Sequence, residues 1–353
     1  SANLTSTNLT NAILTNANLS NAILTGVRSG IVSGDPSALP PTWVLVSGYL
    51  VGPGADLRSA NLTGADLGRV NLTGANVSGA ALYGANLAGV TSGGIIGVPA
   101  TLPPKWVLAG GYLVGPGANL TDANLADVYL GSADLTGAVV TGANLTNANL
   151  TNADLTNAKL DRSILSNATL RLTTITGASM SNASAKGVTA TDLLGTAASL
   201  PTGWVQRVVA QSTFLFGPGV NLARADVTAV DLSGVDLSGA NLQGVVLSSA
   251  KLAGTNLTGA NLSAARLLNA NLTGAVLTAA HVSNTDFKGT TLTGISATNL
   301  DGIPKNIPTG WKYDGASTST TSPGLQKMRV TRSRAICEPV VTTMSSGCAP
   351  IAS

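Results

Sequence analysis

Residues 60–79 read ANLTGADLGRVNLTGANVSG, four five-residue units in which a large aliphatic side chain recurs at every fifth position. These side chains are Leu62, Leu67, Leu72 and Val77, and a small residue, mostly alanine, precedes each of them by two positions. A period of five fits neither the 3.6 of an α-helix nor the 2 of a long strand. It predicts a chain that turns a corner every five residues and fills a narrow interior with one small and one large side chain per unit.

The same unit recurs in phase along most of the chain. Four blocks carry it, at about 4–24, 57–87, 120–190 and 222–297. Dozens of units in one phase do not arise from composition alone, and internal repeats of this kind indicate a solenoid. The central core residues that we expect include Leu62, Leu67, Leu72, Leu120, Leu145, Leu242 and Leu262.

This pattern resembles that of the pentapeptide-repeat family over roughly residues 2–300. The resemblance implies an all-β fold, a right-handed quadrilateral β-helix with four units per coil. Residues that are twenty apart in the sequence would then lie on top of one another. We expect a solenoid over 1–314, followed by a linker and a small C-terminal segment over 315–353.

A second motif separates the blocks. It reads LPPTWVLVSGYLVGPG at 39–54 and LPPKWVLAGGYLVGPG at 102–117, with a diverged copy at 200–219 and a truncated copy, IPTGWKYDG, at 307–315. Two short apolar runs around a glycine-containing turn predict a β-hairpin. Hairpin inserts are therefore expected near 31–54, 93–117, 193–219 and 303–314. The combination of both motifs resembles secreted actinobacterial pentapeptide proteins, which implies export.

The aromatic residues of this motif are candidate interaction residues: Trp43, Tyr49, Trp106, Tyr112, Trp204 and Trp311. One hypothesis makes them exposed docking or carbohydrate-stacking sites. The other makes the hairpins lids that pack on a face of the solenoid, which we favour because alternating apolar residues need a surface to cover.

The composition bounds the function. Charged residues make up 10% of the chain and the net charge is +3, which is unlike the basic stripe of a nucleic-acid binder. The sequence contains no run of eighteen apolar residues, so it predicts no membrane-spanning helix. The sequence opens at Ser1 inside the repeat, without Met, from which we expect a processed N-terminus and an extracellular or cell-surface location.

The C-terminal segment carries two further features. Cys337 and Cys348 close a short loop, which predicts a disulfide in an oxidising compartment, with two free thiols as the alternative. Arg329, Arg332 and Arg334 form either a contact patch for an acidic partner or a solvated strand that caps the open end of the solenoid.

No catalytic constellation is apparent when positions twenty apart are stacked. His281 falls on Asn261 without an acid, and Asp134 falls on Asp154 as a polar ladder rather than a shielded carboxylate pair. No phosphate-binding loop and no zinc-ligand spacing occurs. We therefore predict no catalytic, cofactor-binding or metal site, and a protein that is not an enzyme.

Three hypotheses for function follow. The leading one is a secreted structural rod, a scaffold or filament subunit that associates with itself head to tail, because an uncapped solenoid end exposes unpaired backbone. The second comes from the family resemblance, which includes DNA-mimicking proteins that bind topoisomerases and need a strongly acidic surface. The third is a glycan-binding module that uses the Trp and Tyr hairpins at a cell surface.

Overall fold

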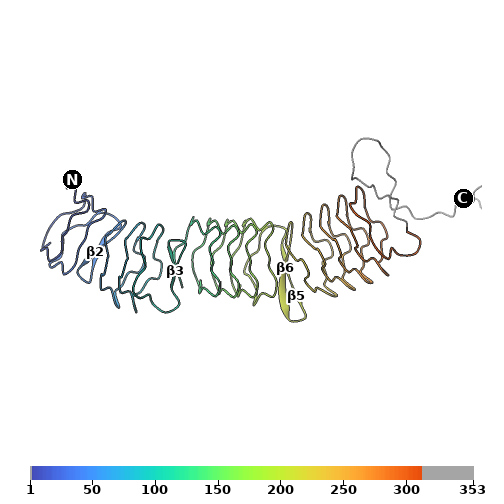
Figure 1. Cartoon of the computed structure of the whole chain (residues 1–353), viewed down its shortest axis with the longest axis horizontal. Helices are drawn as coiled ribbons and strands as arrows, with labels where there is room; N and C mark the ends of the chain where they lie inside the picture. The colour runs from blue at the N-terminus through green and yellow to red at the C-terminus, as the bar shows by residue number, and fades with distance from the viewer. Residues whose placement is uncertain (1, 312–353) are drawn as a thin grey trace, which may run out of the picture.

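The computed structural model describes residues 2–311 and shows one elongated, gently curved rod with the N-terminus at one end (Figure 1). The predicted Cys337–Cys348 disulfide and the arginines at 329, 332 and 334 lie outside the described residues. The strands β2 (Tyr49–Val51), β3 (Val107–Ala109), β5 (Val205–Val209) and β6 (Ser212–Phe216) lie at three places along the rod.

The rod is built from parallel bridges between residues twenty apart, as predicted. In the quoted stretch, the Leu62 N–H donates to the Ala81 carbonyl at 2.9 Å and the Ala81 N–H donates to the Ala60 carbonyl at 2.9 Å. Each unit ends in a turn in which the Ala65 N–H donates to the Leu62 carbonyl, with Gly64 at a φ of 67°. This is the pattern of a type II turn, which requires a left-handed residue at its third position. Glycine and asparagine meet that requirement, which explains why they end so many units.

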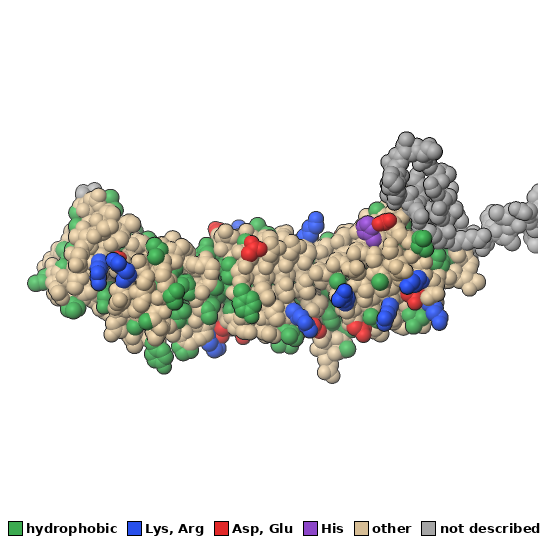
Figure 2. All heavy atoms as spheres, viewed as in Figure 1, with side chains coloured by type: hydrophobic (Ala, Val, Ile, Leu, Met, Phe, Trp, Pro, Cys, Tyr) green, Lys and Arg blue, Asp and Glu red, His purple; other side chains and the backbone are tan. Residues whose placement is uncertain are grey.

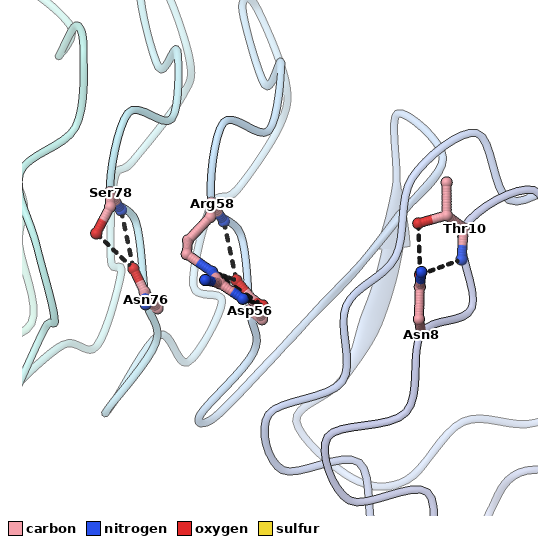
Figure 3. A network of polar contacts seen from close by, with 6 residues as sticks. All are labelled: Asn8, Thr10, Asp56, Arg58, Asn76 and Ser78. Carbon is pink, nitrogen blue, oxygen red and sulfur yellow. Dashed lines mark hydrogen bonds and ion pairs between the residues drawn. The ribbon is translucent and has the colours of Figure 1, made fainter.

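The polar residue before each core leucine closes a second local contact. Asn8 Oδ1 accepts both the Thr10 N–H at 3.0 Å and the Thr10 hydroxyl at 2.7 Å, and Asn76 holds Ser78 in the same way (Figure 3). Short Asn and Asp side chains favour this bond to the backbone two residues on. The A-N-L-T-G unit therefore specifies its own corner, while the alanine and leucine between the corners point inward.

The core is a column of aliphatic side chains in three clusters, which divide at the hairpins around residues 50 and 113. All seven predicted core leucines are buried, none of them more than 1% exposed. Alanines fill the positions between them, and the largest cluster extends from Val114 to Leu300. Close packing along the axis joins each coil to its neighbours, so the rod is stabilised coil by coil.

Three hairpins interrupt the coils, and we call the segments that carry them the first module (39–54), the second module (102–117) and the third module (200–219). Antiparallel pairing joins β1 (Val44–Val46) to β2 (Tyr49–Val51), β3 (Val107–Ala109) to β4 (Tyr112–Val114) and β5 (Val205–Val209) to β6 (Ser212–Phe216). Each lies within a segment predicted to hold a hairpin. In residues 303–311, the described part of the fourth such segment, the structure has no strand.

The inserts lengthen a coil without breaking the stack. Beyond the second module, Asn119 Nδ2 donates to the Thr91 hydroxyl across 28 residues, and beyond the third, Asn221 Nδ2 donates to the Thr189 hydroxyl across 32. The parallel ladder resumes on the far side of each insert, from Asn119 and from Asn221. The modules are therefore loops on the side of one unbroken solenoid.

Candidate functional site

The tryptophans of the modules pack on glycine. A Cβ atom added at Gly52 would lie 2.3 Å from the ring of Trp43, and one added at Gly115 would lie 2.2 Å from the ring of Trp106. The third module repeats this with Gly217 and Trp204. Glycine before proline is required here because the indole lies flat against the backbone. The Trp rings are half-buried lids, as in the packing hypothesis, and Trp311 also packs against the core.

The tyrosines of the first two modules satisfy backbone groups of the next block. The Asn61 N–H donates to the Tyr49 hydroxyl at 3.1 Å, and the Asn124 N–H donates to the Tyr112 hydroxyl at 3.0 Å. These amides face the hairpin, so the ordinary partner twenty-one residues back in the sequence is not above them. Each bond ties a hairpin to the block that follows it, at an exposed site where water also competes for the amide. Both tyrosines are therefore structural residues, a role that the sequence did not reveal.

The third module is built differently. Its strands are five residues long instead of three, and its hairpin projects from the rod between the third and fourth blocks (Figure 1). A cleft of about 770 Å³ lies beside it, lined among others by Arg171, Asp192, Phe214, Arg224 and Asp226. Sequence reasoning did not find this cleft, because its walls come from segments on both sides of the insert.

Ion pairs are few among the described residues, and all but the pair of Arg58 with Asp56 join residues at least 20 apart in the sequence. Arg58 donates to both carboxylate oxygens of Asp56, and this bond holds the pKa of Asp56 below its usual range (Figure 3). Lys105 of the second module reaches Asp134, with 2.8 Å between Nζ and Oδ2. Burial alone would raise the pKa of Asp134, but the bonds from Lys105 and Thr136 outweigh it and lower that pKa. Lys105 thus ties its module to the following block.

The structure corrects the prediction that His281 has no acid beside it. Its stacking on Asn261 is as expected, but on the other side Nδ1 lies 2.7 Å from a carboxylate oxygen of Asp301. Asp301 lies one coil further along, beyond the block in which the repeat was traced. Both side chains are about half exposed, and no nucleophile accompanies them in the contacts of the described residues. The pair is an exposed contact between coils rather than a shielded catalytic dyad.

A serine cluster lies on the third block. Asp161 accepts from the Ser179 hydroxyl and from the Ser181 N–H, and Ser199 bridges the hydroxyls of Ser179 and Ser181. These contacts join three coils, and no histidine takes part in them to activate a serine. Within residues 2–311 no group of three or more His, Cys, Asp or Glu side chains is placed to hold a metal ion. No helix in the described part of the chain is long and apolar enough to cross a membrane.

These features define a β-solenoid of five-residue units with hairpin modules on its side. A family model of pentapeptide repeats matches eight copies, at 1–28, 54–89, 117–152, 153–189, 221–259 and 255–294, which together cover more than half of the chain. The chain therefore belongs to the pentapeptide repeat family, and the predicted family resemblance and fold class are confirmed. The resemblance to secreted actinobacterial members stays a prediction. A comparison with curated proteins finds no match.

Solved structures similar to this chain include two pentapeptide repeat proteins and a fluoroquinolone resistance protein. HetL of the cyanobacterium Nostoc sp. strain PCC 7120, involved in heterocyst differentiation regulation, is 24% identical over 69% of this chain and 91% of its own, with a TM-score of 0.20. Full-length QnrB1, a plasmid-mediated fluoroquinolone resistance protein, is 16% identical over 68% of this chain and 91% of its own, with a TM-score of 0.15. A pentapeptide repeat protein of the Arabidopsis thaliana thylakoid lumen is 20% identical over 44% and 65%, with a TM-score of 0.13. Superpositions at these scores carry no argument about function.

Proposed function

We propose that this protein is a non-enzymatic structural protein of an extracellular or cell-surface assembly, in which the solenoid is a stiff rod. The observation that carries the proposal is the continuity of the backbone ladder. Parallel bridges run from Asn3 to Ser199 and again from Asn221 to Lys305, with one bridge across each of the first two modules. Past the third module, backbone bonds from Asn221 to Val188 and from Gly187 to Gly219 continue the pairing on one face. A structure in which every coil pairs with the next resists bending and extension along its whole length.

Assembly through the ends of the solenoid is the second part of the proposal. Among the described residues, the first coil pairs only with the coil that follows it, at Asn3, Asn8, Ile13 and Asn18. Its inward leucines Leu4, Leu9 and Leu19 are only half-buried, whereas their counterparts further along are fully buried. A second copy stacked on this end would cover both the leucines and the backbone edge.

The surface charge favours this role over a DNA-mimicking one. Acidic and basic side chains are sparse and intermixed on the visible face of the rod (Figure 2). A protein that imitates duplex DNA needs a continuous acidic surface. The fluoroquinolone resistance that describes QnrB1 is therefore not carried over to this chain.

Electron microscopy and sedimentation over a range of concentrations test the proposal. We expect single rods at low concentration and end-to-end chains of rods at high concentration. Leu9→Glu places a charge on the end face and should leave only single rods, while the matched variant Thr10→Glu, on the exposed side of the same coil, should assemble like the wild type. Wild-type protein that remains a single rod at the highest concentration would contradict assembly through the ends.

A further inference from the structure

The three modules align in register, although the third hairpin is longer. In each of them a backbone N–H of the preceding segment donates to the residue four places before the Gly-Pro-Gly: Val32 to Gly48, Ile95 to Gly111 and Leu193 to Thr213. Phe214 therefore occupies the position of Tyr49 and Tyr112. The extra length of β5 and β6 lies between this point and the tip of the hairpin.

The third module lacks the hydroxyl contact that the first two modules make with the following block. Tyr49 and Tyr112 each reach the amide seven residues after the last glycine of their module, at Asn61 and Asn124. The equivalent residue after the third module is Asp226, and Phe214 has no hydroxyl to offer it. The cleft of about 770 Å³ is lined by both residues. The position at which a tyrosine hydroxyl joins hairpin and block in the first two modules thus lines a cleft in the third.

The cleft is lined by equal numbers of basic and acidic side chains. Arg171 and Arg224 face into it with Asp192 and Asp226, so the charges of its lining balance. Arg171 lies 3.5 Å from Asp192, and one oxygen of Asp226 accepts from the N–H and the hydroxyl of Thr228. The second oxygen of Asp226 and the guanidinium of Arg224 form no ion pair among the described residues.

Apolar groups complete the lining. Val209, Phe214, Ala223 and Ala225 belong to it, and of these Val209 and Phe214 are almost fully buried. Acidic and basic side chains lie close together around the base of the projecting hairpin in Figure 2. A surface that combines apolar carbon with paired donors and acceptors suits a ligand that has the same combination.

The hollow surface continues past Asn221. On the other side of this residue lies a second depression of about 480 Å³, lined by Asn167, Lys186, Asn241 and three glycines. Asn221 also lines the first cleft, so the two depressions adjoin. Together they form a groove, which we call the third-module groove, that is longer than a single small molecule requires.

We propose that the third-module groove binds a neutral oligosaccharide. Each sugar hydroxyl both donates and accepts, which matches arginine beside aspartate, and the C–H face of a hexose fits the accessible methyl groups of Ala223 and Ala225. The charges of the cleft balance and Lys186 adds one positive charge to the second depression, which is too little to favour a highly charged ligand. The extended shape accommodates several sugar units. The site differs from the predicted glycan contact through Trp43 and Trp106, whose rings lie against glycine.

The test is titration calorimetry and saturation-transfer NMR of the whole chain with five neutral probes: maltohexaose, cellohexaose, xylohexaose, mannohexaose and N-acetylchitohexaose. We expect saturable binding of at least one probe with a dissociation constant below about 1 mM. Phe214→Tyr restores the residue of the other modules, so it should fold normally and reduce affinity at least tenfold. Arg224→Ala should weaken binding to a similar extent.

Matched controls make the outcome decisive. Tyr112→Phe makes the reverse exchange in the second module, and Arg58→Ala removes an exposed arginine from the block after the first module; neither should change the affinity. Failure of all five probes to bind at millimolar concentration overturns the proposal. Binding that is unchanged in both Phe214→Tyr and Arg224→Ala, or that appears only with a zwitterionic peptide such as Arg-Glu, does so as well.

Discussion

The first two modules and the third share a motif but solve the same steric problem in different ways. All three place a tryptophan flat on a glycine and return to the solenoid through Gly-Pro-Gly. In the first two, a short hairpin begins its second strand with a tyrosine whose hydroxyl reaches the next block. In the third, a longer hairpin carries phenylalanine there and leaves a cleft. The indole–glycine contact is thus the constant part of the module, and the tyrosine position is the variable part.

Within the repeated module, the positions that stabilise the insert therefore differ from the position at which a function can arise. A contact that recurs in every copy holds the insert on the rod. A position that changes in one copy, and opens a surface when it changes, is where a new role can arise without disturbing the core. A solenoid tolerates such a local change because each coil contacts only its neighbouring coils.

Removal of the tryptophan should have the largest effect and should be alike in the second and third modules. Trp106→Ala and Trp204→Ala leave a cavity over Gly115 and Gly217, and each should lower the free energy of unfolding by about 3 kcal/mol. Chemical denaturation, with hydrogen exchange to locate the loss, measures this. The exposed Tyr83→Ala is the control and should change little. A much smaller cost for Trp204→Ala would mean that the third hairpin is held by other contacts.

Exchange of the tyrosine should have a smaller effect that differs in sign between modules. Tyr112→Phe leaves the Asn124 N–H without its acceptor and should cost about 1 kcal/mol. Phe214→Tyr in the third module should be neutral or stabilising, because the added hydroxyl meets the backbone of Asp226. Amide exchange at residues 124 and 226 reports each bond directly. Faster exchange at residue 226 in Phe214→Tyr would show that the two positions are not equivalent.

The repeat and the buried core could be predicted because they are local. Each unit carries its own turn residue, its own Asn or Asp contact and its own inward alanine and leucine, so the period alone places Leu62 or Leu262. The contacts between the inserts and the solenoid could not be predicted, because they depend on which coil each insert folds against. The bond from Tyr49 to Asn61 joins residues that are out of step with the repeat of twenty, as does the ion pair from Lys105 to Asp134. Stacking in steps of twenty could have found Asp301 beside His281 had the ladder been followed past residue 297.

The cleft of the third module was hidden for the same reason. Arg171 and Asp226 belong to separate blocks, and only the folded insert between them brings them to one surface. The sequence does show one difference between the modules, because Phe214 occupies the position at which the other two copies have tyrosine. The loss of one hydroxyl has no visible consequence until the partner amide is known.

The smallest expected effect concerns the ion pair that the second module has and the third lacks. Lys105 stands where the third module has Gly203, and its ammonium lies 2.8 Å from Asp134. The pKa of Asp134 is lowered in the folded state, so the carboxylate contributes stability above its ordinary pKa of about 3.9. That contribution is lost as the pH falls through the lower pKa of the folded state. Asp134→Asn should therefore be slightly less stable than the wild type at pH 7, and the difference should vanish in strong acid.

Local hydrogen exchange separates this effect from the general acid sensitivity of the chain. As the pH falls, protection corrected for intrinsic exchange rates should decrease more at β3–β4 in the wild type than in Asp134→Asn, while β5–β6 responds alike in both proteins. The change should be only a fraction of that caused by Tyr112→Phe, because Lys105 is largely exposed and water screens the pair. An equal response of both hairpins to Asp134→Asn would show that the carboxylate acts through the shared core and not through Lys105.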